Sequence, residues 1–216
     1  MKKVNIFLTI LLLTAGCGGN RQISNECDDS ITTVSYELHD LYIPTDNAQL
    51  YFPLTVFHDF DNFRNKWYSK HLFAMREPII FSDSTQTEVY RFVWLRTFHN
   101  PISIRIEKQQ NIFLLTWKSC NGAGGYEPGQ LTIARQKQIS VINWENFKTL
   151  LNEIDFWNLT TEEKEIMGHD GSQCILEGKN FREYHVVDRW CGGEISNVCI
   201  FLTELTELTF EEEEKY

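Results

Sequence analysis

The middle of the chain alternates between apolar and polar residues in a way that predicts β-strands. Isoleucines at every second position of 102–106 indicate a strand with one buried face. Aromatic residues recur at even positions of 90–98, with Val and Leu among the residues between them, which predicts a strand covered on both faces. Further strands are expected at 50–57, 112–117 and 131–137. Short connections join the strands in the middle of the chain, which favours an antiparallel meander.

Three other segments carry apolar residues at the spacing of a helix. They are 60–71, the stretch around 147–154, and 197–209. Residues 173–177 and 184–190 flank a glycine-containing turn and predict a hairpin. Together these patterns predict an α+β fold, with an antiparallel sheet (meander plus hairpin) and about three helices packed against one face of it.

The N-terminal residues have the pattern of a bacterial lipoprotein signal. Lys2 and Lys3 precede a short apolar run at 4–13, and small residues follow directly before Cys17. Thr14 stands where such signals usually carry leucine. The apolar run is about half the ~20 residues that a membrane-spanning helix needs. The sequence therefore predicts cleavage after residue 16 and acylation of Cys17 with fatty acids such as palmitate. The alternative is an ordinary signal peptide that leaves Cys17 unmodified.

This interpretation fixes an expected organisation of the chain. Residues 1–16 are the signal peptide, 17–30 a tether, 31–210 a single globular domain and 211–216 an acidic tail. Acyl chains on Cys17 would anchor the protein in a lipid bilayer, on the periplasmic or cell-surface side of the bacterial envelope.

Composition and charge narrow the classes of partner. The chain has 216 residues, of which 42% are hydrophobic, enough for a substantial core. Its formal charge of −10 becomes −12 when Lys2 and Lys3 leave with the signal peptide. Such an acidic surface argues against nucleic acid and anionic headgroups as partners. No motif for a cofactor is present.

Five cysteines remain beside Cys17, and in an oxidising compartment pairs of them are expected to form disulfides. We predict a disulfide between Cys191 and Cys199, because the glycines after Cys191 could turn the chain back. There is no CxxC and no close Cys/His pair, so no metal site is predicted. The other three cysteines are Cys27, Cys120 and Cys174.

The predicted hairpin carries the densest cluster of polar residues. Alternation places His185 and Arg189 on one face of their strand, and Glu177 lies across the hairpin. A histidine beside a carboxylate can act as a general base, and arginine can bind an anion. The alternative is a cross-strand ion pair between Glu177 and Arg189 with no chemistry.

A second polar group surrounds the turn at 100–101. Arg96, His99 and Arg105 could bind an anionic ligand, or they could neutralise acidic residues within the sheet. His99 is also a weaker candidate for a catalytic base.

The loop 119–129 contains four glycines but lacks the Gly-Lys-Ser/Thr of a phosphate loop. It reads as a wide hairpin loop. If it is functional, Tyr126 and Glu127 are the side chains it presents.

Three segments resemble those of a widespread set of uncharacterised bacterial proteins. They are WLRTFHNP at 94–101, GAGGY at 122–126, and the stretch from Asp170-Gly171 to YHVVDRW at 184–190. The resemblance covers roughly residues 60–209 and implies no known activity. Members carry tryptophan where this chain has Cys174, which is a departure from their pattern.

Three function classes follow from these features. The first is a membrane-anchored module that binds a small ligand or a protein. A protein-binding module would show an exposed apolar or aromatic patch, for example beside the glycine-rich loop. The second is an envelope hydrolase using His185 or His99 with a carboxylate. The third is a structural lipoprotein. Any site is expected on one sheet face bearing Arg96, Arg105, Glu177, His185 and Arg189.

Overall fold

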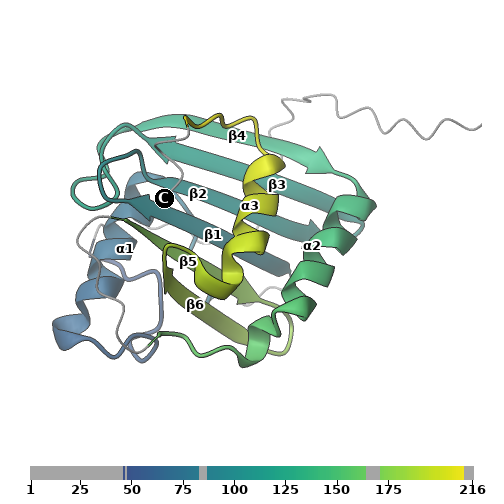
Figure 1. Ribbon diagram of the computed structural model, residues 1–216, viewed down its shortest axis with the longest axis horizontal. Coiled ribbons are helices and arrows are strands. Elements are labelled where there is room, and N and C mark those ends of the chain that lie inside the picture. Colours follow the sequence, from purple (N-terminus) through teal and green to yellow (C-terminus); the bar gives the residue numbers. More distant parts are fainter. Residues whose placement is uncertain (1–45, 47, 83–86, 164–170, 212–216) are drawn as a thin grey trace, which may run out of the picture.

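The computed structural model describes residues 46, 48–82, 87–163 and 171–211. Six antiparallel strands form one sheet in the order β4-β3-β2-β1-β5-β6 (Figure 1). The meander is followed by a hairpin that joins the sheet beside β1, which confirms the predicted α+β fold. The strands are β1 (Glu88–Arg96), β2 (Ile102–Gln109), β3 (Ile112–Cys120), β4 (Leu131–Ile139), β5 (Ser172–Lys179) and β6 (Tyr184–Trp190).

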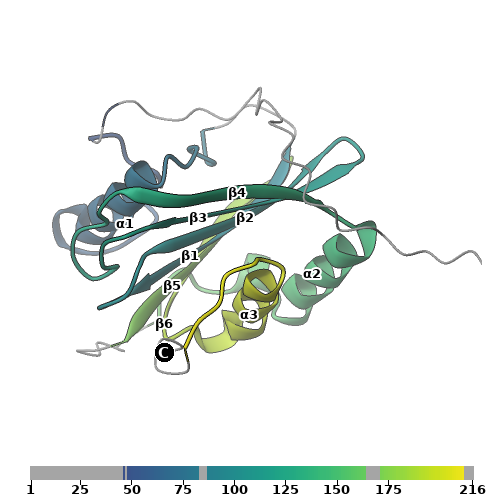
Figure 2. The ribbon, with the colours of Figure 1, turned by 90° about the horizontal axis from the view of Figure 1, so that it is seen from above.

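Helices cover both faces of the sheet, so the expectation of one covered face is wrong. Helix α1 (Phe63–Ala74) lies on one face, whereas α2 (Val141–Glu153) and α3 (Ser196–Glu204) lie on the other (Figure 2). Two hydrophobic clusters result, because β1 buries side chains in both directions. Tyr90 and Phe92 join the cluster under α2 and α3, and Val93 and Leu95 join the cluster under α1. No helix in the described part of the chain is long and apolar enough to cross a membrane.

Residues 50–57 form no strand, contrary to the prediction. Tyr51 and Phe52 are buried, but their backbone bonds to α1 and not to a strand. The Tyr51 N–H donates to Ser69 Oγ (2.9 Å), and Asn65 Nδ2 donates to the Phe52 carbonyl (2.9 Å). The apolar pattern therefore marks a segment that fills the space beside α1.

Two helix boundaries differ from the sequence pattern. Helix α1 begins only at Phe63, because Asp61 and Asn62 adopt positive φ angles (56° and 52°) that interrupt the helix. Helix α3 ends at Glu204, and residues 205–211 continue without regular secondary structure apart from a turn. The start of α2 is fixed by Ser140, whose side chain accepts a hydrogen bond from the Asn143 N–H.

Candidate functional site

The polar residues predicted to form one site lie on opposite faces of the sheet. Arg105 and Glu177 point toward α1, whereas Arg96, His185 and Arg189 belong to the face covered by α2 and α3. The register explains the separation of the hairpin residues, since Glu177 is paired with Val186 and not with His185. The expectation of one shared face is therefore wrong.

Glu177 and Arg105 are members of a buried ionic cluster under α1. Arg91, opposite Glu177 on the neighbouring strand, donates to its carboxylate, so the predicted Glu177–Arg189 pair does not form. At the centre of the cluster, Glu77 lies 3.0 Å from Lys118 Nζ, 3.2 Å from Arg105 Nε and 3.7 Å from Arg91. Each buried charge in this cluster depends on its partners, so the loss of one would leave the others uncompensated.

The titration behaviour of the cluster follows from burial and its cations. Burial alone would raise the pKa of Glu77, but Lys118, Arg105 and Arg91 outweigh it and lower the pKa to about 2. For Glu177, burial prevails over Arg91, and the pKa of its carboxyl is raised.

The structure does not bring the candidate catalytic histidine His185 to its expected carboxylate partner, Glu177. The His185 ring packs edge-on against Phe156 (centroids 5.2 Å apart), and burial lowers its pKa. Its expected partner Glu177 lies on the other face of the sheet. His99 contributes its backbone to the turn after β1, where its carbonyl accepts a hydrogen bond from the Gly124 N–H (2.9 Å). The geometry therefore does not support a catalytic pair of His185 and Glu177.

The three segments that carry the resemblance meet around Thr97. The Gly125 N–H donates to the Thr97 carbonyl (3.2 Å), and the Thr97 N–H donates to the Gly171 carbonyl (2.9 Å). A Cβ on Gly124 would lie 2.6 Å from Leu95 C and Arg96 N, so only glycine fits there. These glycines allow close backbone packing at one end of the sheet. Residues 169 and 170 lie outside the described part of the chain.

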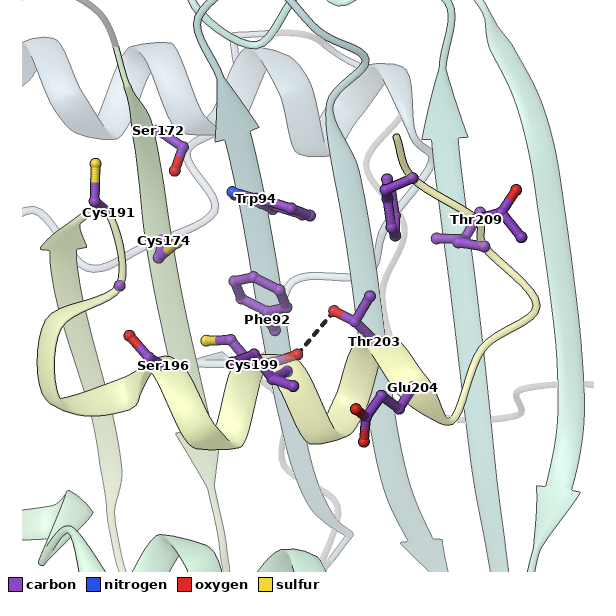
Figure 3. Close-up of a pocket in the computed structure, with 14 residues that line it drawn as sticks. Phe92, Trp94, Ser172, Cys174, Cys191, Ser196, Cys199, Thr203, Glu204 and Thr209 are labelled. Atoms are coloured by element: carbon purple, nitrogen blue, oxygen red, sulfur yellow. Dashed lines mark hydrogen bonds between the residues drawn. The ribbon is translucent and has the colours of Figure 1, made fainter. Parts of the chain in front are cut away.

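A cavity of about 600 Å³ opens between the sheet, α3 and the segment that follows α3 (Figure 3). This volume is within the range of small-molecule sites. Aromatic rings of β1 form its floor, and the chain at 208–210 forms one wall. Its lining is Phe92, Trp94, Ser172, Cys174, Cys191, Gly192, Ser196, Cys199, Ile200, Thr203, Glu204, Leu208, Thr209 and Phe210.

Three thiols line this cavity, and the predicted disulfide between Cys191 and Cys199 is not formed. Cys191 is exposed at a positive φ (53°) just after β6, while Cys199 is buried on the sheet side of α3. Burial raises the pKa of Cys174 to about 12 and raises the pKa of Cys199 well above its usual value. The two buried thiols therefore stay protonated and behave as apolar groups. Cys17 and Cys27 lie outside the described residues.

The cavity lining has little charge. Among the described lining residues, Glu204 is the one ionisable side chain besides the thiols, and it lies on the outer part of α3 (Figure 3). The nearest predicted anion-binding residue, Arg96, is buried with its guanidinium 4.5 Å from the Trp94 ring centre and 5.0 Å from that of Phe210. Arg189 forms ion pairs, with its Nε 2.7 Å from a carboxylate oxygen of Glu194 and 3.3 Å from one of Glu163. Because the described lining is mostly apolar and contains no basic side chain, the site suits apolar ligands.

A buried carboxylate that the sequence analysis did not select lies between α1 and β6. Asp188 accepts hydrogen bonds from Tyr68 Oη (2.8 Å) and from Arg64 (3.4 Å), which also reaches Glu162 (2.6 Å). Burial raises the pKa of Asp188 to about 6. In the sequence, Asp188 directly follows two apolar valines of a predicted strand, a pattern that indicates a buried carboxylate.

An exposed aromatic surface lies beside the glycine-rich loop. We use the name aromatic surface for the exposed residues Phe60, Phe63, Phe98 and Tyr126 together with the half-buried Trp67 that lies among them. Phe98 and Tyr126 are each 58% exposed, and their ring centres lie 6.2 Å apart. Tyr126 is therefore exposed on its loop, and it is not among the residues that line the cavity.

No group of three or more His, Cys, Asp or Glu side chains within the described ranges is arranged to hold a metal ion. Comparisons with protein-family models, with curated proteins and with solved structures find no match to this chain.

Proposed function

We propose that this protein is a cell-envelope lipoprotein, anchored through acylated Cys17, whose folded domain binds a small apolar ligand. The observation that carries the proposal is the cavity of about 600 Å³ between β1, β5 and α3. The basic start, apolar run and small residues before Cys17 support the anchor.

The chemistry of the cavity defines the ligand class. Phe92, Trp94 and Phe210 offer large apolar surfaces, and the protonated thiols of Cys174 and Cys199 add soft apolar contacts. Basic side chains are absent from the described lining, so a carboxylate or phosphate would lose its hydration without compensation. An uncharged, largely apolar molecule fits these walls.

Binding is tested with the neutral fluorophore N-phenyl-1-naphthylamine. We expect its fluorescence to rise on addition of the protein and to be displaced by long-chain alcohols but less well by the corresponding fatty acids. Thr209→Trp, at the exposed edge of the cavity, should weaken binding about tenfold or more by filling space. Glu207→Trp, exposed and outside the lining, is the matched control. Equal binding by both variants, or none by the wild type, would refute the ligand proposal.

The anchor is tested separately by growth with labelled palmitate. The wild-type chain should incorporate label at Cys17, and Cys17→Ser should incorporate none. Label on the Cys17→Ser variant would contradict the proposed anchor.

A further inference from the structure

The aromatic surface begins at an irregular turn before α1. Phe60 is 94% exposed and Phe63 is 64% exposed. Between them, Asp61 and Asn62 take left-handed conformations, which cost energy for residues other than glycine. The turn prevents α1 from starting earlier and leaves both phenylalanine rings in solvent.

The surface continues from α1 onto the glycine-rich loop through direct contacts. Trp67 lies 6.0 Å from Phe63 between ring centres, and its Nε1 donates to the Gly124 carbonyl (2.9 Å). Two residues further along that loop, Tyr126 meets Phe98. Helix α1 and the loop therefore present one set of aromatic side chains on a firmly held backbone.

The charges around this surface neutralise one another. Lys66 pairs with Asp61 (2.7 Å), and Lys70 pairs with Glu127 (2.9 Å). These two ion pairs add no net charge beside the aromatic rings, while the chain as a whole is acidic. Exposed aromatic rings with balanced charges suit the interface of a zwitterionic bilayer, where amphipathic and aromatic groups accumulate.

The chain enters the domain on the same side as α1. Tyr51 and Phe52 are hydrogen-bonded to this helix, and the segment lies beside it in both views (Figures 1 and 2). Ala48 is 31 residues after Cys17, a length that spans at most about 110 Å. A domain tethered at this range meets its membrane at a high effective concentration, so a weak second contact is enough to orient it.

We infer that the aromatic surface docks on a zwitterionic lipid bilayer, an inference that rests on the proposed lipid anchor. Phe60 and Phe63 enter the interface, and the aromatic side chains of the glycine-rich loop lie along it. Helices α1 and α3 are on opposite faces of the sheet (Figure 2), so the ligand cavity stays open to solvent in the docked protein.

The test uses the mature chain, residues 17–216, carrying Cys17→Ser, which has neither the apolar signal peptide nor acyl groups, in flotation with phosphatidylcholine vesicles. We expect measurable binding that falls about tenfold or more in Phe60→Ser/Phe63→Ser, since binding scales with inserted apolar area. The matched control is Phe181→Ser/Ile142→Ser. It removes two apolar side chains outside the aromatic surface, which are 72% and 65% exposed. This control should bind within twofold of its parent. Circular dichroism verifies that all variants are folded.

Each outcome of the flotation experiment bears on the inference. No binding of the unacylated chain, or equal losses in both double variants, would overturn it. Binding that appears only with anionic lipid would also overturn it, because it would indicate an electrostatic contact. Palmitate labelling is independent of this assay, so a failed anchor and a failed docking surface are told apart.

Discussion

Replacing Glu77 with glutamine should destabilise the protein strongly at neutral pH. The pKa of this buried carboxyl is about 2 against an ordinary 4.5, which corresponds to about 3 kcal/mol of folding free energy at pH 7. Glu77→Gln retains the shape but leaves Arg91, Arg105 and Lys118 without their shared counter-charge. Removing one partner of a buried ionic group typically costs about 3–5 kcal/mol, and we expect a loss in this range.

The pH dependence of this loss has a definite sign. A carboxyl whose pKa is lowered in the folded state contributes its full stability above the unfolded pKa and loses it as the pH falls toward the folded pKa. The free-energy difference between wild type and Glu77→Gln should therefore be constant above about pH 5 and shrink by about 2 kcal/mol at pH 3.

Urea unfolding followed by tryptophan fluorescence between pH 3 and pH 7 measures both quantities. The exposed Glu127, paired with Lys70 at the surface, supplies the control Glu127→Gln, which should change stability by less than about 0.5 kcal/mol. The reasoning would be refuted by a loss below about 1 kcal/mol for Glu77→Gln at pH 7. A difference that does not change with acidification would refute it as well.

Three further predictions concern the loop, the cavity and the buried aspartate. Gly124→Ala should cost about 2–3 kcal/mol in urea unfolding, because its Cβ would meet backbone atoms of Leu95 and Arg96 at 2.6 Å, and a cost below about 0.5 kcal/mol would contradict this. Cys191→Ser should lower by one the number of thiols that react with Ellman's reagent in the native protein, and an unchanged number would contradict the exposure of this thiol. Because Cys191 lines the cavity, bound N-phenyl-1-naphthylamine should slow the reaction in the wild type. The pKa of Asp188 is raised to about 6 from 3.8, so its contribution to stability falls as the pH rises through this window. Asp188→Asn should therefore gain about 2 kcal/mol relative to wild type between pH 4 and pH 7, and parallel stability curves would exclude this.

The sheet could be predicted because burial of strand faces leaves a period of two in the sequence. Residues 102–106 show that period directly, and they lie in β2 as expected. The strand predicted at 50–57 failed because apolar side chains also fill irregular segments, as Tyr51 does beside α1. The local apolar pattern predicts which residues are buried, but it does not predict the secondary structure of the segment that carries them.

The residue partners could not be predicted, because they depend on strand register and strand order. The hairpin pattern predicts that Glu177 and His185 are neighbours. In the structure Glu177 pairs with Val186, so the side chains of Glu177 and His185 lie on opposite faces of the sheet. The true partner of Glu177, Arg91, comes from the strand on its other side, 86 residues away in sequence. Only the long-range topology brings these charges together.

The cavity could not be predicted either, because it depends on where α3 ends. Apolar periodicity continued to residue 209, but the helix stops at Glu204. The chain then turns, so that Leu208 and Phe210 form a wall of the cavity instead of another helical turn. Phe210 is held there against the Arg96 guanidinium, a long-range contact with no local signal.

Titration of the 15N-labelled protein with N-phenyl-1-naphthylamine, followed through the tryptophan indole N–H resonances, tests the central claim most directly. Trp94 lines the cavity, whereas Trp67 lies on the opposite face of the sheet. The six indole signals can be assigned by single Trp→Phe variants. We predict a saturable shift of the Trp94 signal with the Trp67 signal unchanged. A titration in which the Trp94 signal does not move, or in which only Trp67 responds, would contradict the proposed ligand site.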